Sequence, residues 1–323
     1  MKRTQKPDAW LALIRLPNIF TVPGDVIVGY IIGESTLENA GILLGFSVPS
    51  NKFLTFTALY AVAAVLCIYI FGLVTNDIAD VDEDRKERPY RPLASGAISI
   101  PKAWILSAIL LAAGLISAKF AGTNVFYTVL LLSACVISYN FFLKKYPVTG
   151  VLLLAFCRAL ALFTGYYAAG QSAPYSFMMN SAAVLWILYF TILSAIAYNE
   201  TSQHSFGPEK YLLPLLPFLW LISIPAGSEA LPVVLILREL PPAVLLSLIL
   251  LLGFSAVTFR VFLILNSARP DPAVIQKSVG ILIRNVVLLQ ASVCAIMGYP
   301  YTAAALLILY TATALTAKRF YSS

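Results

Sequence analysis

Charged residues are scarce in this sequence: Asp, Glu, Lys and Arg make up 11% of its 323 residues. A soluble domain carries about 25% charged residues, because its surface must be hydrated. Here hydrophobic residues account for 60%, so the chain has too few polar groups to cover a surface in water. This shortage excludes a soluble globular protein, a disordered chain and a nucleic-acid-binding module. It predicts a protein that lies in a lipid bilayer.

Histidine and cysteine are scarce as well, with one histidine and four cysteines. The cysteines lie in separate apolar runs, and none has a second cysteine or a histidine at the spacing of metal ligands. A free cysteine of this kind behaves as a small hydrophobic residue. The sequence therefore excludes a metal site built from cysteine and histidine.

The N-terminus lacks the apolar core and cleavage site of a removable signal peptide. Residues 1–16 instead predict a helix that lies in the membrane interface, because Lys6 and Arg15 flank an apolar face. The residues of this face are Trp10, Leu11, Leu13 and Ile14.

Long apolar runs fill most of the remaining chain. A helix needs about 20 apolar residues to span the hydrocarbon core of a bilayer. Runs near that length lie at 18–33, 54–75, 103–120, 124–143, 151–169, 181–198, 211–224, 243–265, 281–298 and 300–317. They lack the alternation of a membrane β-barrel, so we expect a single all-α integral membrane domain, over residues 1–323, with ten crossings. The seventh run is short and rich in proline, which leaves open a broken helix or one that continues to residue 237.

Basic residues between alternate runs set the expected orientation. With a cytoplasmic N-terminus, the loops on the cytoplasmic side all contain lysine or arginine, and the opposite loops contain only Arg238. These cytoplasmic loops are 76–102, 144–150, 199–210, 266–280 and 318–323. Since positive charge near helix ends favours the cytoplasmic side, ten crossings with the N-terminus inside fit the sequence best.

One segment breaks the apolar pattern with acid rather than base. Asp77, Asp80 and Asp84 follow the second run, and spacings of three and four residues put them on one face if the helix continues. Carboxylates on one face repel each other unless a cation lies between them, and hard oxygen ligands suit Mg²⁺. Basic residues just downstream supply charge for phosphate groups. The segment predicts a magnesium and diphosphate site; the alternative is a solvated charged loop between two helices.

The full motif reads Asn76-Asp77-x-x-Asp80-x-x-x-Asp84, followed by Arg88-Pro89-x-Arg91-Pro92-Leu93-x-x-Gly96. It resembles the first aspartate-rich motif of the UbiA-type intramembrane prenyltransferases. The N-terminal Arg15-Leu16-Pro17-Asn18 is similar to the opening signature of that family, and Tyr139-Asn140 with Lys144 is similar to its tyrosine-to-lysine segment. The resemblance covers about residues 10–298, which leaves 300–317 as an extra C-terminal helix.

The resemblance implies a bundle of about nine family helices around a central cavity that opens to lipid and is capped on the cytoplasmic side. It implies transfer of a prenyl group from a polyprenyl diphosphate to an aromatic or other electron-rich acceptor, in the bacterial cytoplasmic membrane. Mg²⁺ would be the cofactor, held by Asp77, Asp80 and Asp84. The diphosphate would be bound by Lys144, Asn18, Asn76, Arg88 and Arg91.

The chain departs from the family after the sixth run, where a second aspartate-rich motif is expected. Residues 198–204 contain no aspartate, so Glu200 is the candidate metal ligand there. A loop without the second metal would fit a protein that binds or exports an isoprenoid or secondary metabolite without catalysis. Residues 15–29, 88–93 and 271–273 look most like the UbiA-like EboC proteins, which belong to a bacterial gene cluster tied to export of secondary metabolites.

Two charged residues lie inside apolar runs, where charge is costly and usually faces the interior of a bundle. We expect Arg158 either to line the substrate cavity or to pair with an acid such as Asp25. Two of the proposed diphosphate ligands have simpler interpretations, Lys144 as a positive anchor at a helix end and Asn18 as a helix cap.

Overall fold

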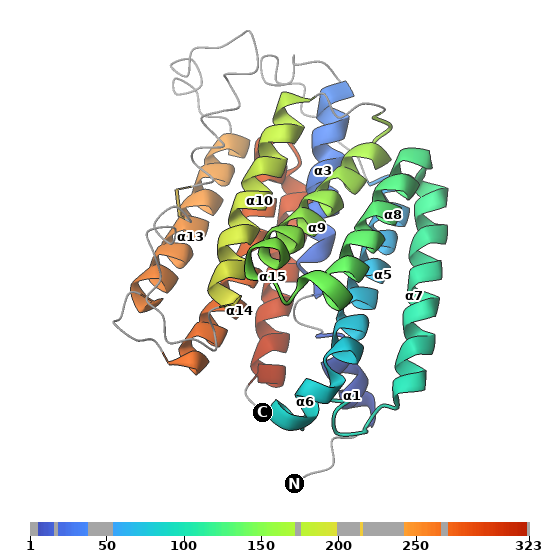
Figure 1. Cartoon of the computed structure of the whole chain (residues 1–323). Helices are drawn as coiled ribbons and strands as arrows, with labels where there is room; N and C mark the ends of the chain where they lie inside the picture. Colours follow the sequence, from blue (N-terminus) through green and yellow to red (C-terminus); the bar gives the residue numbers. More distant parts are fainter. Residues whose placement is uncertain are drawn as a thin grey trace.

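The computed structural model describes residues 6–15, 19–37, 54–171, 176–198, 214–215, 242–265 and 271–321. Within these ranges every regular element is a helix, and the long helices form one bundle, which confirms the all-α class (Figure 1). The helices are α1 (Lys6–Leu13), α3 (Val22–Leu37), α5 (Phe56–Ala79), α6 (Val81–Glu87), α7 (Ile100–Ala121), α8 (Thr123–Ser138), the π-helix η1 (Tyr139–Leu143), α9 (Pro147–Ala168), α10 (Phe177–Tyr198), α13 (Pro242–Leu265), α14 (Pro272–Ile296) and α15 (Pro300–Tyr321).

Seven of the helices are long and apolar enough to cross a membrane. They are α5, α7, α8 with η1, α9, α10, α13 and α14. The first and last apolar runs fall on α3, which has 16 residues, and on α15, whose described apolar part is Pro300–Thr311. The seventh run, at 211–224, lies outside the described residues apart from 214–215. The chain is therefore a multi-pass membrane protein, and the number of ten crossings stays a prediction.

Capping residues start some helices well before their apolar runs. Helix α14 begins at Pro272, although its apolar run begins at 281. The Asp271 carboxylate accepts the backbone N–H of Ala273 at 3.0 Å, and proline suits the first turn because it has no N–H to leave unpaired. Helix α9 likewise begins at Pro147, before its run at 151. A proline in the first turn therefore starts both helices before their apolar runs, and in α14 the Asp271 side chain caps the start as well.

Helices α3 and α9 pack at very close range through glycine. A Cβ atom at Gly29 would lie 1.8 Å from the carbonyl oxygen of Leu162, and one at Gly165 would lie 1.8 Å from that of Val26. Small residues let membrane helices approach closely, and here a side chain on either glycine would collide with backbone. The close crossing brings the charged residues inside these two helices within reach of each other.

Helix α1 packs against the end of α5. Its Ala9 and Leu13 are buried in a cluster that includes Val74 and Ile78 of α5 and the downstream Leu93. Part of the apolar face expected for residues 1–16 therefore contacts protein. The location of this helix in the membrane interface stays a prediction. The packing places the end of α1 beside the aspartate-rich segment.

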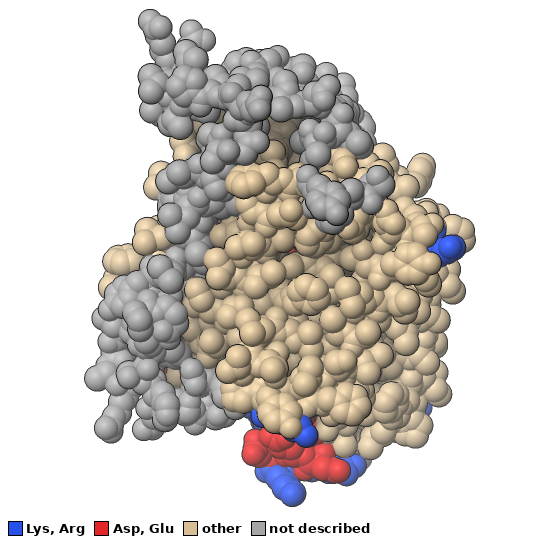
Figure 2. Space-filling view, turned by 45° about the horizontal axis from the view of Figure 1, so that its top comes forward, with Lys and Arg blue, Asp and Glu red and all other residues tan. Residues whose placement is uncertain are grey.

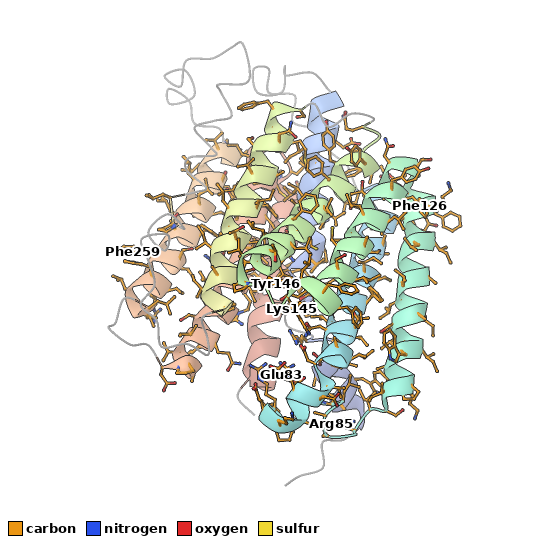
Figure 3. The ribbon with its side chains drawn as sticks, viewed as in Figure 1. Glu83, Arg85, Phe126, Lys145, Tyr146 and Phe259 are labelled. Carbon is orange, nitrogen blue, oxygen red and sulfur yellow. The ribbon has the colours of Figure 1, made fainter. Side chains whose placement is uncertain are left out.

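Charged side chains gather at the end of the bundle where α6 lies. Figure 2 shows most of the described charged side chains at one end of the face in view, below a broad belt of uncharged side chains. Figure 3 places Glu83 and Arg85 at this end, whereas Phe126 and Phe259 project from opposite flanks of the bundle. A charged end and apolar flanks are what a bundle needs when lipid surrounds its middle.

Candidate functional site

The aspartate-rich segment forms the junction between α5 and α6. Helix α5 ends at Ala79, Asp80 lies between the two helices, and α6 begins at Val81. The expectation of one continuous helix that carries all three aspartates on one face is therefore wrong. Helix α6 has acidic residues in its first turn and basic residues in its last, a charge order that complements its dipole and favours a separate helix.

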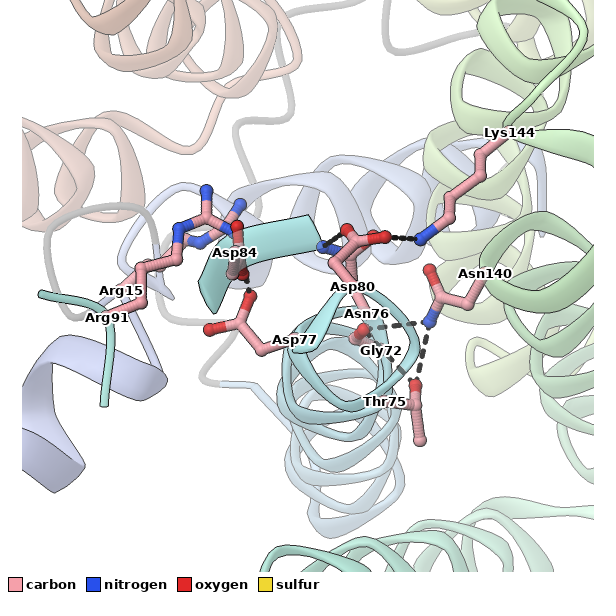
Figure 4. Close-up of polar contacts among 10 residues, drawn as sticks. All are labelled: Arg15, Gly72, Thr75, Asn76, Asp77, Asp80, Asp84, Arg91, Asn140 and Lys144. Atoms are coloured by element: carbon pink, nitrogen blue, oxygen red, sulfur yellow. Dashed lines mark hydrogen bonds and ion pairs between the residues drawn. The ribbon is translucent and has the colours of Figure 1, made fainter. Parts of the chain in front are cut away.

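Asp77 and Asp84 face two arginines (Figure 4). Arg15 Nη2 donates to Asp77 Oδ1 at 3.1 Å. Arg91 Nη1 donates to Asp84 Oδ2 at 2.7 Å and lies 3.7 Å from Asp77 Oδ1. Asp77 is only 4% exposed and Asp84 only 5%, so each carboxylate depends on a cationic partner for its charge. Arg91 therefore joins the two carboxylates into one cluster.

Asp80 points to the opposite side of the junction (Figure 4). Its Oδ1 atom forms an ion pair with Lys144 Nζ, and its Oδ2 atom accepts the Asn76 Nδ2 donor at 3.1 Å. Lys144 follows η1, so a residue far along the chain reaches the aspartate-rich segment. The structure thus brings together Asp80, Asn76 and Lys144, which the sequence analysis assigned to one site.

The two arginines each have an unusual feature: Arg91 in its pKa and Arg15 in its backbone conformation. Burial opposes the charge of Arg91, but its hydrogen bond to Asp84 and the charge of Asp77 raise the pKa of its guanidinium above the ordinary value. Arg91 therefore stays positively charged at any physiological pH. Arg15 has a φ of +48°, a left-handed conformation that residues other than glycine rarely adopt. Backbone strain of this kind recurs at functional sites.

The other predicted site residues do not join this cluster. Arg88 ends α6 half-buried, and its side chain makes no hydrogen bond or ion pair with another residue in the described part of the chain. Asn18 and Glu200 lie outside the described residues. Arg158 lies in the bundle interior, where its Nε atom is 2.8 Å from Asp25 Oδ2. The structure therefore realises the ion pair, the second of the two alternatives for Arg158.

Asp25 is fully buried and is the centre of a polar network between helices. Its Oδ1 atom accepts Trp186 Nε1 of α10 at 2.8 Å and Gln290 Nε2 of α14 at 2.7 Å. Arg158 of α9 also lies over the Phe190 ring, with 4.4 Å from Cζ to the ring centroid. Both carboxylate oxygens of Asp25 are engaged by neighbouring helices, so this acid joins four helices of the bundle.

The donors at the junction suit a divalent metal by their chemistry. Mg²⁺ binds hard oxygen ligands, and Asp77, Asp80 and Asp84 supply three carboxylates within one short segment. Across the described ranges, no three side chains of His, Cys, Asp or Glu converge into a ready metal site. Asp77 and Asp84, which share Arg91, are the pair most nearly arranged for a shared cation. The chemical type of these oxygen donors therefore fits Mg²⁺, and a shared metal requires Asp80 to turn toward the other two aspartates.

Arg15 was not predicted as a partner of Asp77. Its position suggested a flanking charge of an interfacial helix, although the Arg15-Leu16-Pro17-Asn18 motif was a usable signal. Trp186 and Gln290 were also not predicted as partners of Asp25. A tryptophan or glutamine in an apolar run gives no sign in the sequence of what it faces.

Residues 40–279 match the model of the UbiA prenyltransferase family. The chain is 30% identical over 194 residues to the probable homogentisate phytyltransferase 2 of Oryza sativa subsp. japonica, with 58% of this chain and 49% of that protein covered. It is 26% identical over 185 residues to the digeranylgeranylglyceryl phosphate synthase of Sulfurisphaera tokodaii, with 57% and 60% covered. The chain thus spans about half the length of the curated relatives it matches.

The fold is similar to a solved UbiA homologue from Archaeoglobus fulgidus bound to DMAPP and Mg²⁺. The TM-score is 0.55 at 18% sequence identity, and the match covers 91% of this chain and 98% of the other. At this identity the likeness shows a shared fold. The narrower resemblance to EboC proteins stays a prediction.

Proposed function

Because the chain belongs to the UbiA prenyltransferase family, we propose that it transfers a prenyl group from a polyprenyl diphosphate, with Mg²⁺ as cofactor. The acceptor would be an aromatic or other electron-rich molecule. The matched residues, 40–279, include the α5–α6 junction, Arg91 and Lys144, so most of the candidate site lies in the part that carries the family match, and Arg15 lies before it. The names of the two curated relatives state different reactions, so the proposal extends to the chemical class of the acceptor and not to one molecule.

The observation that carries the proposal is the meeting of acids and bases at the α5–α6 junction (Figure 4). Three segments that are separate in the sequence bring Arg15, Arg91 and Lys144 against the aspartates. A solvated loop that merely ends two helices would leave its carboxylates in water, but Asp77 and Asp84 are almost entirely buried. A diphosphate and a divalent cation match this set, because the anion suits the bases and the cation suits the acids.

In the proposed reaction the C–O bond of the prenyl diphosphate breaks, and diphosphate leaves with the electron pair. The acceptor supplies the electron pair of the new bond and loses a proton. Arg15, Arg91 and Lys144 would bind the diphosphate oxygens, where negative charge grows as the bond breaks. Fixed positive charge there stabilises the transition state more than the ground state.

The aspartates would hold the metal in this proposal. Mg²⁺ bound to Asp77, Asp80 and Asp84 would supply further charge neutralisation for the diphosphate. Asn76, which donates to Asp80, would keep that carboxylate in place. Each basic side chain must then move from its aspartate to the diphosphate. Mg²⁺ replaces that side chain as the counter-ion of the carboxylate.

The remaining predicted residues have separate roles in this proposal. We place Arg88 and Asn18 at the diphosphate and Glu200 at a second metal. Arg88 is half-buried at the end of α6, within the same segment as Arg91. Arg158 is engaged by Asp25 inside the bundle, so we assign it to the architecture and not to the diphosphate.

We further propose that the junction faces the cytoplasm of a bacterial cell and that the N-terminus lies on the same side. Helices α1 and α6 lie at one end of the bundle, which is also the charged end (Figures 1 and 2). Basic residues mark cytoplasmic ends of membrane helices. An apolar chamber above the junction, open to lipid, would hold the prenyl tail and exclude water from the reacting carbon.

The proposal is tested by pyrophosphate release from geranylgeranyl diphosphate, with the purified protein in lipid nanodiscs and with or without Mg²⁺. We expect release that depends on Mg²⁺, and loss of release in Asp84→Asn. Asp82→Asn is the matched control, because Asp82 lies in the same helix with its side chain 86% exposed. Absence of metal-dependent release with every common chain length, while the diphosphate still binds, would instead support the non-catalytic binding or export protein.

A further inference from the structure

We propose that Asn140 is a positioning residue that holds Lys144 against Asp80. Asn140 lies at the start of η1, four residues before Lys144, and is 3% exposed. It is too enclosed to be a ligand for a substrate, and its contacts are with α5. The inference rests on the proposed function only in that Lys144 is taken as a diphosphate ligand.

The amide of Asn140 is bound to the last turns of α5 (Figure 4). Its Nδ2 atom donates to the carbonyl oxygen of Gly72 at 2.9 Å and to Thr75 Oγ1 at 2.7 Å. Thr75 is fully buried and donates its own hydroxyl proton to the carbonyl oxygen of Phe71 at 2.8 Å. Both N–H groups of the amide are therefore used, and the start of η1 is tied to α5 just before the aspartate-rich segment.

The π-helix explains why the hydrogen bonds of Asn140 also affect the position of Lys144. In η1 the backbone N–H of Lys144 donates to the carbonyl oxygen of Tyr139, five residues earlier, at 3.0 Å. A turn of this kind carries one residue more than an α-helical turn, and such turns are frequent at functional sites. Asn140 and Lys144 both face α5, one turn apart. Their partners follow in the same order, with Thr75 in α5 and Asp80 directly after it, so the amide sets the distance at which Lys144 meets Asp80.

The same hydrogen-bond pattern occurs once more within the described residues, in a helix where no lysine lies four positions later. Asn285 of α14 donates through Nδ2 to the carbonyl oxygen of Phe254 and to Thr258 Oγ1 of α13, both at 2.9 Å. The residue four positions after Asn285 is Leu289, which is fully buried. Asn285 therefore joins two helices without an equivalent of Lys144 to position. It serves as the matched control for Asn140.

The experiment compares Asn140→Leu, Asn285→Leu, Lys144→Gln and the double variant Asn140→Leu/Lys144→Gln. Binding of geranyl diphosphate is measured in nanodiscs with Mg²⁺, and the melting temperature is measured for each protein. We expect Asn140→Leu to weaken binding by about tenfold, the order of one hydrogen bond to a charged group. Asn285→Leu should lower the melting temperature similarly and change binding by less than about twofold. In the Lys144→Gln background, Asn140→Leu should weaken binding of geranyl diphosphate by less than about a further twofold.

A second measurement needs no ligand and separates this inference from the proposed function. Trace acylation of the Lys144 amine, followed by mass spectrometry, should speed up in Asn140→Leu and stay unchanged in Asn285→Leu. Faster acylation in a protein that binds no diphosphate would support the positioning role and overturn the proposed function. Equal acylation in the two asparagine variants would overturn the positioning role. A tenfold loss of binding caused by Asn140→Leu in the Lys144→Gln background would also overturn the positioning role.

If Asn140→Leu does not fold, Thr75→Val replaces it, because valine keeps the shape of threonine and removes the hydroxyl that accepts from Asn140. The same changes in acylation and binding, in smaller measure, are expected. No change in either would contradict the inference.

Discussion

Two sets of ion pairs lie at different depths of this bundle, and their surroundings differ. Inside the bundle, Asp25 is fully buried and is held by Arg158, Trp186 and Gln290 from three other helices. At the α5–α6 junction, the aspartates pair with bases that come from the chain near helix ends, and those bases are partly exposed. The interior pair is enclosed by helices, whereas the bases at the junction are partly exposed and can exchange their partners.

A charge inside the bundle stabilises the fold, whereas a charge at its end is available to a ligand. A buried ion pair repays its desolvation only if both partners remain, so it binds helices together. A pair at the membrane boundary costs less to separate, because water reaches its cation. The comparison therefore assigns stability to Asp25 and binding to the junction, and the variants below test each assignment.

The largest expected effect is the loss of stability in Asp25→Ala. It leaves Arg158 as an unpaired charge inside the bundle, which costs about 3–5 kcal/mol of unfolding free energy. Thermal unfolding in detergent, followed by circular dichroism, should show a large fall in the melting temperature. The double variant Asp25→Ala/Arg158→Met should recover part of it, because it removes the unpaired charge. A melting temperature equal to that of the wild type in Asp25→Ala would contradict the interior assignment.

The second effect is on binding, in Arg91→Gln. This change removes the cation that donates to Asp84 and faces Asp77. We expect affinity for geranylgeranyl diphosphate to fall by about ten- to a hundredfold, the equivalent of roughly 1.5–3 kcal/mol for a hydrogen bond to a charged group. Titration in nanodiscs measures it, with Arg85→Gln on the exposed face of α6 as the control. If both variants bind equally well, Arg91 is not a diphosphate ligand.

The third effect again falls on the interior, in Gly165→Ala. The added Cβ would meet the carbonyl oxygen of Val26, so α3 and α9 must separate and the distance from Asp25 to Arg158 must grow. Overpacking of this kind costs about 1–3 kcal/mol. Thermal unfolding measures the loss, and Gly253→Ala on α13 is the control, because a Cβ there has its nearest contact at 3.9 Å. Equal losses in the two variants would argue against the close crossing.

The smallest effect is expected for Asp82→Ala. Asp82 and Arg85 form an exposed pair at 2.8 Å, with side chains 86% and 52% exposed. Exposed pairs contribute about 0–1 kcal/mol, so neither the melting temperature nor diphosphate affinity should change measurably. A marked loss of affinity would extend the site onto the outer face of α6.

Apolar length alone predicts most of the helices. The run at 243–265 is observed as Pro242–Leu265, because a stretch of that length has no alternative to a helix in lipid. The same argument fails at α14, where Asp271 and Pro272 start the helix in a polar segment. Apolar length also fails to predict the break at Asp80. A second helix, α6, begins there in a charged segment whose acidic first turn and basic last turn favour a separate helix.

The candidate site was predictable where a motif names it, as for Asp84 and Lys144. The sequence does not show how the carboxylates divide between the two sides of the junction. That division depends on which part of the chain supplies each base: Arg15 comes directly after α1, and Lys144 directly after η1. Gln290 was out of reach for the same reason, since its role exists only once α14 packs against α3.

The most direct test is a crystal structure of the protein soaked with Mn²⁺, as a stand-in for Mg²⁺, and a non-reactive geranylgeranyl diphosphate analogue. The account predicts an anomalous peak bonded to aspartates of the α5–α6 junction, with Arg15, Arg91 and Lys144 moved onto the diphosphate oxygens. Bases that remain on their aspartates, with metal and diphosphate bound elsewhere or not at all, would contradict it.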